Sequence, residues 1–130
     1  MNTKIWPYKM DSEKNISQSE VLAKVVLRIA EQLQLKESEL AMILGSSDAD
    51  LSLAIKENEL APNTPQGERA LALVRIYQAG FSLHGGDVEW MLNFINSPNR
   101  LLNHQTPRTL LQTEHGLNEV LQLVEGLQQR

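Results

Sequence analysis

The sequence predicts an all-α fold, and three observations support this prediction. Over most of the chain, apolar residues recur at intervals of three and four positions, which is the spacing of one helix face. Between these stretches stand the serine, threonine, proline and glycine residues that commonly begin or end helices. Sustained alternation of apolar and polar residues, which is typical of strands, occurs nowhere in the sequence. We therefore expect a chain of helices without internal repeats or low-complexity segments.

The first predicted helix covers residues 18–34. Ser17 and Glu20 have the Ser-x-x-Glu spacing of a capping box, in which each side chain binds a backbone N–H group of the first turn. An apolar stripe follows at helical spacing, formed by Val21, Leu22, Val25, Val26, Ile29, Ala30 and Leu33. Residues 1–16 mix polar residues with an aromatic pair, Trp6 and Tyr8, and are predicted to be a flexible leader.

Two short helices are predicted next. The first covers residues 37–44 and ends at Gly45, because glycine readily adopts the positive φ that often ends a helix. Ser47 then has the position of an N-cap, with Asp50 three residues later. The helix that it begins is expected to run to about Glu57. Its inward-facing residues are predicted to be Leu51, Ala54 and Ile55.

Thr64 and Pro65 are predicted to begin the next helix, because proline suits a first helical position, where its missing N–H group is not needed. This helix is expected to end at Gly80. The face that it buries is predicted to comprise Ala70, Leu71, Val74 and Tyr77. Gly85 and Gly86 then break the chain.

Three helices are predicted in the remaining part of the chain. One covers residues 87–96 and stops before Pro98, since the residue preceding a proline avoids the helical region. Thr106 and Pro107 repeat the cap-and-proline opening for a short helix, and Thr113 caps a final one. The apolar positions of the final helix follow helical spacing at Leu117, Val120, Leu121, Val124 and Leu127.

Composition and charge exclude several classes of function. The net charge of -4 argues against indiscriminate binding to nucleic acid or to anionic membranes. The absence of cysteine excludes disulfides, thiolate metal sites and cysteine nucleophiles. The longest apolar run, from Ala41 to Leu44, is far shorter than the roughly 20 residues that a membrane-spanning helix needs. Because the N-terminus also lacks the apolar core of a signal peptide, we expect a cytoplasmic protein.

No arrangement of residues in the sequence predicts catalysis. His84, His104 and His115 stand alone, without a second ligand at metal-binding spacing. The glycines form no phosphate-binding pattern, and Ser46 and Ser47 lack the partners of a nucleophile. We therefore predict a protein without enzymatic activity and without a metal or cofactor.

A motif in the first half of the chain resembles the helix-turn-helix of Xre-type regulators. It reads Glu39-Leu40-Ala41-x-x-Leu44-Gly45, followed by Ser46-Ser47 and a second short helix. The resemblance implies that four residues contact DNA, namely Ser46, Ser47, Ser52 and Lys56. The charge pattern argues against this role, because residues 37–59 hold six acids and only one base, and acids repel phosphates. A scaffold retained for packing or dimerisation is the favoured interpretation.

The last third of the chain resembles the toxin-binding domain shared by the Xre, MbcA and ParS antitoxins. Its motif reads Phe94-Ile95-Asn96-Ser97-Pro98-Asn99, Leu102, Thr106-Pro107, Leu110-Leu111 and Thr113-Glu114-His115-Gly116, and it ends in an amphipathic helix. The likeness covers residues 86–127. Phe94 replaces the usual tryptophan of the family, and Asn103-His104 stand where the family usually has glycine.

This resemblance implies a set of toxin-binding residues: Phe94, Pro98, Asn99, Leu102, Pro107, Arg108, Leu111, Glu114, Val120, Val124, Gly126 and Arg130. Leu111, Val120 and Val124 have a second interpretation as core residues. Pro98 and Pro107 also serve as helix ends. Four polar members of the set are expected to be exposed and to contribute specificity at an interface. These are Asn99, Arg108, Glu114 and Arg130.

By the same resemblance, the fold is an Xre-like helix-turn-helix bundle followed by a small helical toxin-binding domain. The expected division is a leader at 1–16, a helix-turn-helix domain at 17–84 and a toxin-binding domain at 85–130. The implied function is that of an antitoxin in a type II pair. Its partner is a cognate toxin, commonly a RES-domain enzyme that consumes NAD. Residues 113–130 are expected to cover the toxin's substrate pocket.

Antitoxins of this family usually form dimers, so the apolar stripe of the predicted helix at 18–34 is a candidate dimer surface. Two alternatives remain open. The chain could be a DNA-binding repressor of its own operon, recognising operator DNA alone or together with the toxin. It could also be an interaction module whose toxin has been lost.

Overall fold

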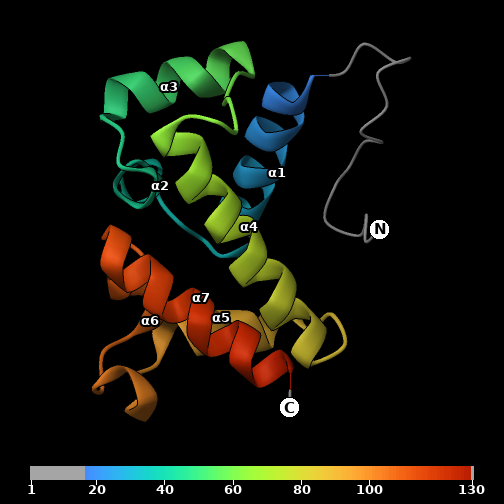
Figure 1. Ribbon diagram of the computed structural model, residues 1–130, viewed down its shortest axis with the longest axis vertical. Helices are drawn as coiled ribbons and strands as arrows, with labels where there is room; N and C mark the ends of the chain where they lie inside the picture. Colours follow the sequence, from blue (N-terminus) through green and yellow to red (C-terminus); the bar gives the residue numbers. More distant parts are fainter. Residues whose placement is uncertain (1–16, 130) are drawn as a thin grey trace.

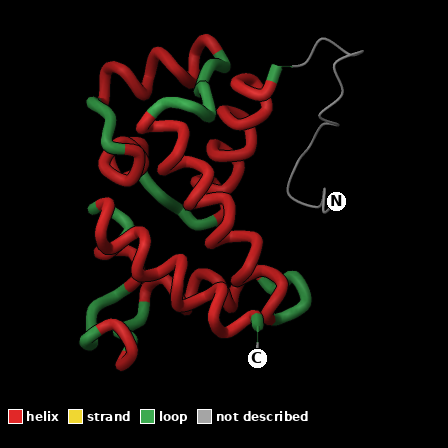
Figure 2. Tube along the Cα trace, viewed as in Figure 1, coloured by secondary structure: helices red, strands yellow, loops and turns green. Residues whose placement is uncertain are grey.

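The computed structural model describes residues 17–129, and it confirms the predicted all-α fold (Figures 1 and 2). The elements are, in order, α1 (Gln18–Gln32), α2 (Glu37–Leu44), α3 (Asp48–Glu57), α4 (Pro65–Leu83), α5 (Val88–Asn96), the 3-10 helix η2 (Arg100–Leu102), α6 (Pro107–Leu110) and α7 (Glu114–Gln128). Within the described range, extended pairing is limited to one bridge, between Asn99 and Gln105. The predictions made for residues 1–16 lie outside the described residues.

The long helix α4 organises the molecule, because every other α-helix except α3 and α6 packs directly on it. In Figure 1, α1, α2 and α3 surround its first half, while α5 and α7 lie along its second half. α3 contacts α1 and α2, and α6 contacts α5 and α7. The buried apolar residues form one cluster that extends from Val21 in α1 to Val124 in α7. The two halves of the chain therefore share a helix and a core.

Side-chain caps begin most helices, and the five predicted from Ser17, Ser47, Thr64, Thr106 and Thr113 are confirmed. Each hydroxyl oxygen accepts a hydrogen bond from the backbone N–H group three residues later. These bonds satisfy N–H groups that have no partner within the helix. Asp87 caps α5 in the same way. Gly45 ends α2 with a φ of 68°, as predicted.

The predicted end of α4 at Gly80 is wrong, since the helix continues to Leu83. Gly80 is buried where α4 meets α5, and a Cβ atom at this position would lie 2.3 Å from the Sδ atom of Met91. The glycine therefore allows close helix packing and does not stop the helix. Three residues predicted to face inward are only partly buried: Ala54, Ile55 and Leu71.

The apolar stripe of α1 is used inside the chain. Its buried residues pack against α3 and α4, and Val21, Leu22 and Val25 have no exposed surface. The proposal that this stripe forms a dimer surface is therefore corrected, because the core of the monomer already covers it. No helix among residues 17–129 is long and apolar enough to span a membrane.

Candidate functional site

The segment 97–106, between α5 and α6, forms an exposed loop whose shape is set largely by Asn99. The N–H group of Asn99 donates to the carbonyl of Gln105 at 3.1 Å, and its own carbonyl accepts from the N–H groups of Leu102 and His104, both at 2.9 Å. Its side-chain Oδ1 accepts from the N–H group of Leu101 at 2.8 Å. The asparagine thereby closes the loop on itself and caps η2.

Asn103 and His104 have φ angles of 57° and 63°, in the left-handed region. These are the positions at which the resemblance expects glycine. Asparagine and histidine enter this region more readily than most residues, although less readily than glycine. The turn therefore keeps a glycine-like backbone conformation without a glycine.

Leu101 lies in η2 with 66% of its surface exposed, whereas its neighbour Leu102 is 4% exposed. Leu102 is part of the core, and η2 packs against α7. In the described part of the chain, three large apolar residues are exposed: Leu101, Met42 and Leu53. Leu101 has the largest exposed fraction of the three. Sequence reasoning named Leu102 and missed Leu101. The signal available was the adjacent pair of leucines in one turn, of which only one can face the core.

Five residues predicted to bind the toxin are buried: Leu102, Pro107, Leu111, Val120 and Val124. Leu111, Val120 and Val124 have no exposed surface, so the interpretation of these three as core residues agrees with the structure. The prediction of direct contact is corrected for all five. Because their side chains pack inside the chain, they support the shape of the surface and do not form it.

The other predicted residues lie at or near the surface. Pro98, Glu114 and Gly126 are exposed, and Asn99 is partly buried. Phe94 is also partly buried and stacks on Trp90, with ring centroids 5.4 Å apart. The structure does not describe Arg130. Pro98 and Leu101, with the partly buried Asn99 between them, therefore form a local and largely exposed group on loop 97–106.

α7 has a buried apolar face and an outer polar face. Leu117, Val120, Leu121 and Val124 are buried in the core, and α7 packs along α4 (Figure 1). Asn118, Gln122 and Gly126 are exposed. An ion pair between Arg75 of α4 and Glu125 of α7 also joins the two helices, with a closest N–O distance of 2.7 Å. The final helix is therefore an integral part of the fold, and only its outer face is available to a partner.

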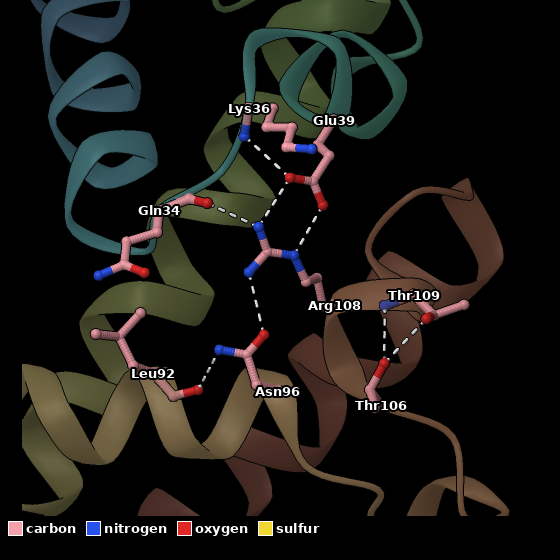
Figure 3. A network of polar contacts seen from close by, with 8 residues as sticks. All are labelled: Gln34, Lys36, Glu39, Leu92, Asn96, Thr106, Arg108 and Thr109. Atoms are coloured by element: carbon pink, nitrogen blue, oxygen red, sulfur yellow. Dashed lines mark hydrogen bonds and ion pairs between the residues drawn. The ribbon is translucent and has the colours of Figure 1, made fainter.

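Arg108, predicted as an exposed specificity residue, is instead bound within the chain (Figure 3). Its Nε and Nη2 atoms donate to the two carboxylate oxygens of Glu39 in α2, both at 2.8 Å. Nη2 also donates to the carbonyl of Gln34 at 2.7 Å, and Nη1 donates to Oδ1 of Asn96 at 3.1 Å. Every guanidinium nitrogen already has an acceptor within the chain, which favours a structural role, and direct toxin contact by Arg108 remains a prediction.

The charge of Glu39 is strongly favoured at this position. The hydrogen bonds from Arg108 lower the pKa of the Glu39 carboxyl from 4.5 to about 2, against a smaller opposing effect of burial. Glu39 also accepts a hydrogen bond from the N–H group of Lys36 at the start of α2. The side chains of Arg108 and Glu39 are 24% and 19% exposed, so water screens the pair less than it screens a pair at the open surface.

In the first half of the chain, the residues predicted to contact DNA are mostly engaged in local bonds. The Ser47 hydroxyl oxygen caps α3, and the Ser46 hydroxyl donates to the carbonyl of Ser47. The Ser52 hydroxyl donates to a carboxylate oxygen of Glu37 at 2.5 Å. Lys56 is exposed. All three serine hydroxyls therefore already form hydrogen bonds within the chain.

A hollow of about 350 Å³ lies between α3 and the start of α4. Asp50 and Glu59 stand on its wall beside apolar residues such as Leu51 and Leu60. Carboxylates repel the phosphate groups of nucleic acids, so this hollow adds no support for a DNA-binding surface. The motif-bearing helices α2 and α3 thus have the order of a helix-turn-helix without its usual positive charge.

Comparisons with known proteins show that loop 97–106 lies in a segment similar to a known protein domain. The family model for the antitoxin Xre/MbcA/ParS C-terminal toxin-binding domain matches residues 79–130. The protein "Antitoxin Xre" of Yersinia enterocolitica serotype O:8 / biotype 1B is 36% identical over 66 residues, which cover 50% of this chain and 45% of that protein. The chain therefore spans less than half the length of this relative. Residues 79–130, from the end of α4 through α7, are therefore similar to the C-terminal toxin-binding domain of the Xre/MbcA/ParS antitoxins.

Proposed function

We propose that this chain is the antitoxin of a type II toxin–antitoxin pair and that it neutralises its toxin by direct binding. The observation that carries the proposal is the match of residues 79–130 to a toxin-binding domain. A relative that bears the name Antitoxin Xre supports it. The exposed group on loop 97–106 supplies a surface within the matched segment.

Leu101 is the proposed anchor of this surface. Its side chain is largely in water in the described chain, and burial of a leucine stabilises a complex by about 1.5–3 kcal/mol. Pro98 and Asn99 lie beside it in sequence and fix the loop that presents it. An apolar residue held on a shaped loop loses little entropy on binding, so most of its burial energy contributes to affinity.

The test compares Leu101→Ser with Leu53→Ser. Both leucines are exposed, at 66% and 53%, but Leu53 lies on α3, outside the matched segment. We expect Leu101→Ser to weaken toxin binding about tenfold or more, since about 1.4 kcal/mol corresponds to a factor of ten. Leu53→Ser should bind as the unmodified chain does. Titration calorimetry with the purified toxin measures both effects, and equal affinities for the two variants would reject Leu101 as the anchor.

The proposed toxin is a RES-domain enzyme that consumes NAD, and the proposed mechanism is steric coverage of its substrate pocket. The support for this toxin class is the family resemblance. Deletion of residues 113–130 is a poor test, because it removes Leu117, Val120 and Val124 from the core. The sharper experiment follows NAD in cells that express a RES-domain toxin. The full chain should preserve the NAD level and Leu101→Ser should not, whereas NAD loss despite the full chain would reject this toxin class.

A further inference from the structure

We infer that Arg108 is a positioning residue that locks the toxin-binding loop onto the first half of the chain. As a result, Glu39, which lies outside the matched segment 79–130, controls toxin affinity. This inference rests on the proposed function. It assigns a role in toxin binding to Glu39, a residue outside the segment that matches the toxin-binding domain.

The bonds of Arg108 close the base of the loop. Asn96 is the last residue of α5 and Arg108 is the second residue of α6, so they stand immediately before and after segment 97–107. The Nη1 atom of Arg108 donates to Oδ1 of Asn96 at 3.1 Å, and Asn96 in turn donates from Nδ2 to the carbonyl of Leu92 at 2.9 Å (Figure 3). The two ends of the loop are thereby held together and tied to the body of α5.

The same guanidinium anchors the closed loop to the first half of the chain. It forms a two-point contact with Glu39, and it reaches the carbonyl of Gln34 in the connection between α1 and α2. Two parallel bonds from arginine to a carboxylate fix orientation as well as distance. The N–H group of Lys36 holds the carboxylate from the other side, at 3.0 Å. Loop 97–106 is therefore supported by a fixed point that is 69 residues away from Arg108 in the sequence.

Leu101 depends on this support because it lies near the middle of the loop. Its own N–H group is held by Asn99, but the bonds of Asn99 are all within the loop. They fix the loop's internal shape and not its placement on the fold. The placement is supplied by the burial of Leu102 and by the bonds of Arg108. Loss of the Glu39 contact should therefore let the loop move and should raise the entropy cost of binding.

The experiment uses the full chain and a double-mutant cycle of Glu39→Gln, Arg108→Met and the two combined. The matched control is Glu37→Gln. It removes a carboxylate from the same helix, α2, but the partner of that carboxylate is Ser52 of α3. Two quantities are measured for each variant. Hydrogen exchange reports the protection of the loop amides of Leu101, His104 and Gln105 in the chain alone. Titration calorimetry reports affinity for the RES-domain toxin that the unmodified chain neutralises, purified as an inactive variant.

We expect Glu39→Gln to speed exchange at the loop amides and to weaken toxin binding about tenfold, because hydrogen bonds to charged groups contribute about 1.5–3 kcal/mol. Arg108→Met should have a similar effect, and the double variant should be little worse than either single one. Glu37→Gln should change neither quantity. Arg108→Lys keeps the charge without the two-point contact, so its affinity should fall between those of the unmodified chain and Arg108→Met.

Three results would overturn the inference. The first is Glu39→Gln with unchanged affinity, whether or not the loop exchanges faster. The second is an Arg108→Met effect that persists in full when Glu39 is already replaced, because additive losses indicate that Arg108 acts on toxin binding independently of Glu39. The third is equal loss in Glu37→Gln. A failure of the proposed function is distinguishable, since the unmodified chain would then bind no toxin while the exchange measurement still reports on the loop.

Discussion

At Asn99, one residue supplies a side-chain acceptor, a backbone donor and a backbone acceptor to the same loop. This concentration of bonds allows Asn103 and His104 to remain in left-handed conformations. Such conformations cost on the order of 1 kcal/mol for residues other than glycine, and the surrounding bonds offset that cost. The polar residues of the loop fix its shape, which leaves Leu101 to face water and, by our proposal, the toxin.

Two glycines provide a prediction at the residue scale. We expect Gly80→Ala to destabilise the chain by about 1–3 kcal/mol, because the added Cβ atom would lie 2.3 Å from the Sδ atom of Met91, which has no exposed surface and would have to shift within the core. Gly126→Ala should instead stabilise by up to about 1 kcal/mol, since its Cβ atom meets nothing within 4 Å and alanine favours the helix. Urea unfolding measures both. Equal effects of the two changes would contradict the close packing at Gly80.

At the scale of elements, an ion pair between Glu39 and Arg108 joins α2 to α6. Both of its side chains are largely covered, unlike those of most surface pairs. Arg75 and Glu125 also form a two-point contact, but their side chains are 56% and 32% exposed, so water screens that pair more strongly. The pair of Arg108 and Glu39 is less exposed and has further acceptors at Gln34 and Asn96. It fixes the position of a helix of only four residues, α6, which makes few contacts of its own with the first half of the chain.

The ion pair predicts a specific dependence of stability on pH. The pKa of Glu39 is about 2 in the folded chain and ordinarily 4.5, so the unfolded chain takes up the proton first as the pH falls. The stabilisation is present above a pH of about 4.5 and is lost as the pH falls toward about 2. In Glu39→Gln, the free energy of unfolding should decline less between neutral and acidic pH than in the unmodified chain. Urea unfolding at several pH values checks this, and identical slopes would show that the pair does not contribute.

At the scale of the whole molecule, α4 makes the two halves interdependent. The largest interface between helices is that of α4 with α7, and it crosses the predicted boundary at residues 84 and 85. The division into domains at 17–84 and 85–130 remains a prediction. In the structure, however, the buried face of α7 needs α4, and α4 also packs against α1 and α2.

This interdependence predicts the behaviour of a fragment. Residues 85–130 alone should lack stable helical structure, because Leu117, Val120, Leu121 and Val124 would lose the partner face on α4. Small helical segments without such packing are marginal in water. Circular dichroism with a thermal melt of the fragment, compared with the full chain under the same conditions, tests this. A cooperative melt of the fragment would show that the segment folds without α4.

Much of the fold could be predicted from the sequence because its signals are local. Caps such as Thr64 and Thr113 act on N–H groups three residues away, and apolar spacing marks the buried face of each helix. The remaining features depend on residues that are distant in the sequence. The role of Gly80 is set by Met91 on another helix, and the role of Arg108 is set by Glu39. Periodicity reports which face is apolar, but it does not report what covers that face.

The candidate site was predictable only in part, for the same reason. The family motif located the loop and its fixed points, Pro98 and Asn99, and its apolar positions turned out to belong to the core. A motif that holds a domain together is dominated by residues that shape it. Leu101, which the motif does not specify, is exposed at the position where a partner can reach it.

The sharing of α4 has a consequence for engineering the chain. An attempt to transplant toxin specificity into a related scaffold would naturally exchange the matched segment, residues 79–130. That junction falls inside α4 and leaves Glu39, the partner of Arg108, behind in the donor. A working chimera therefore needs a donor that also carries α4 from Pro65, together with an acid at the recipient position equivalent to Glu39.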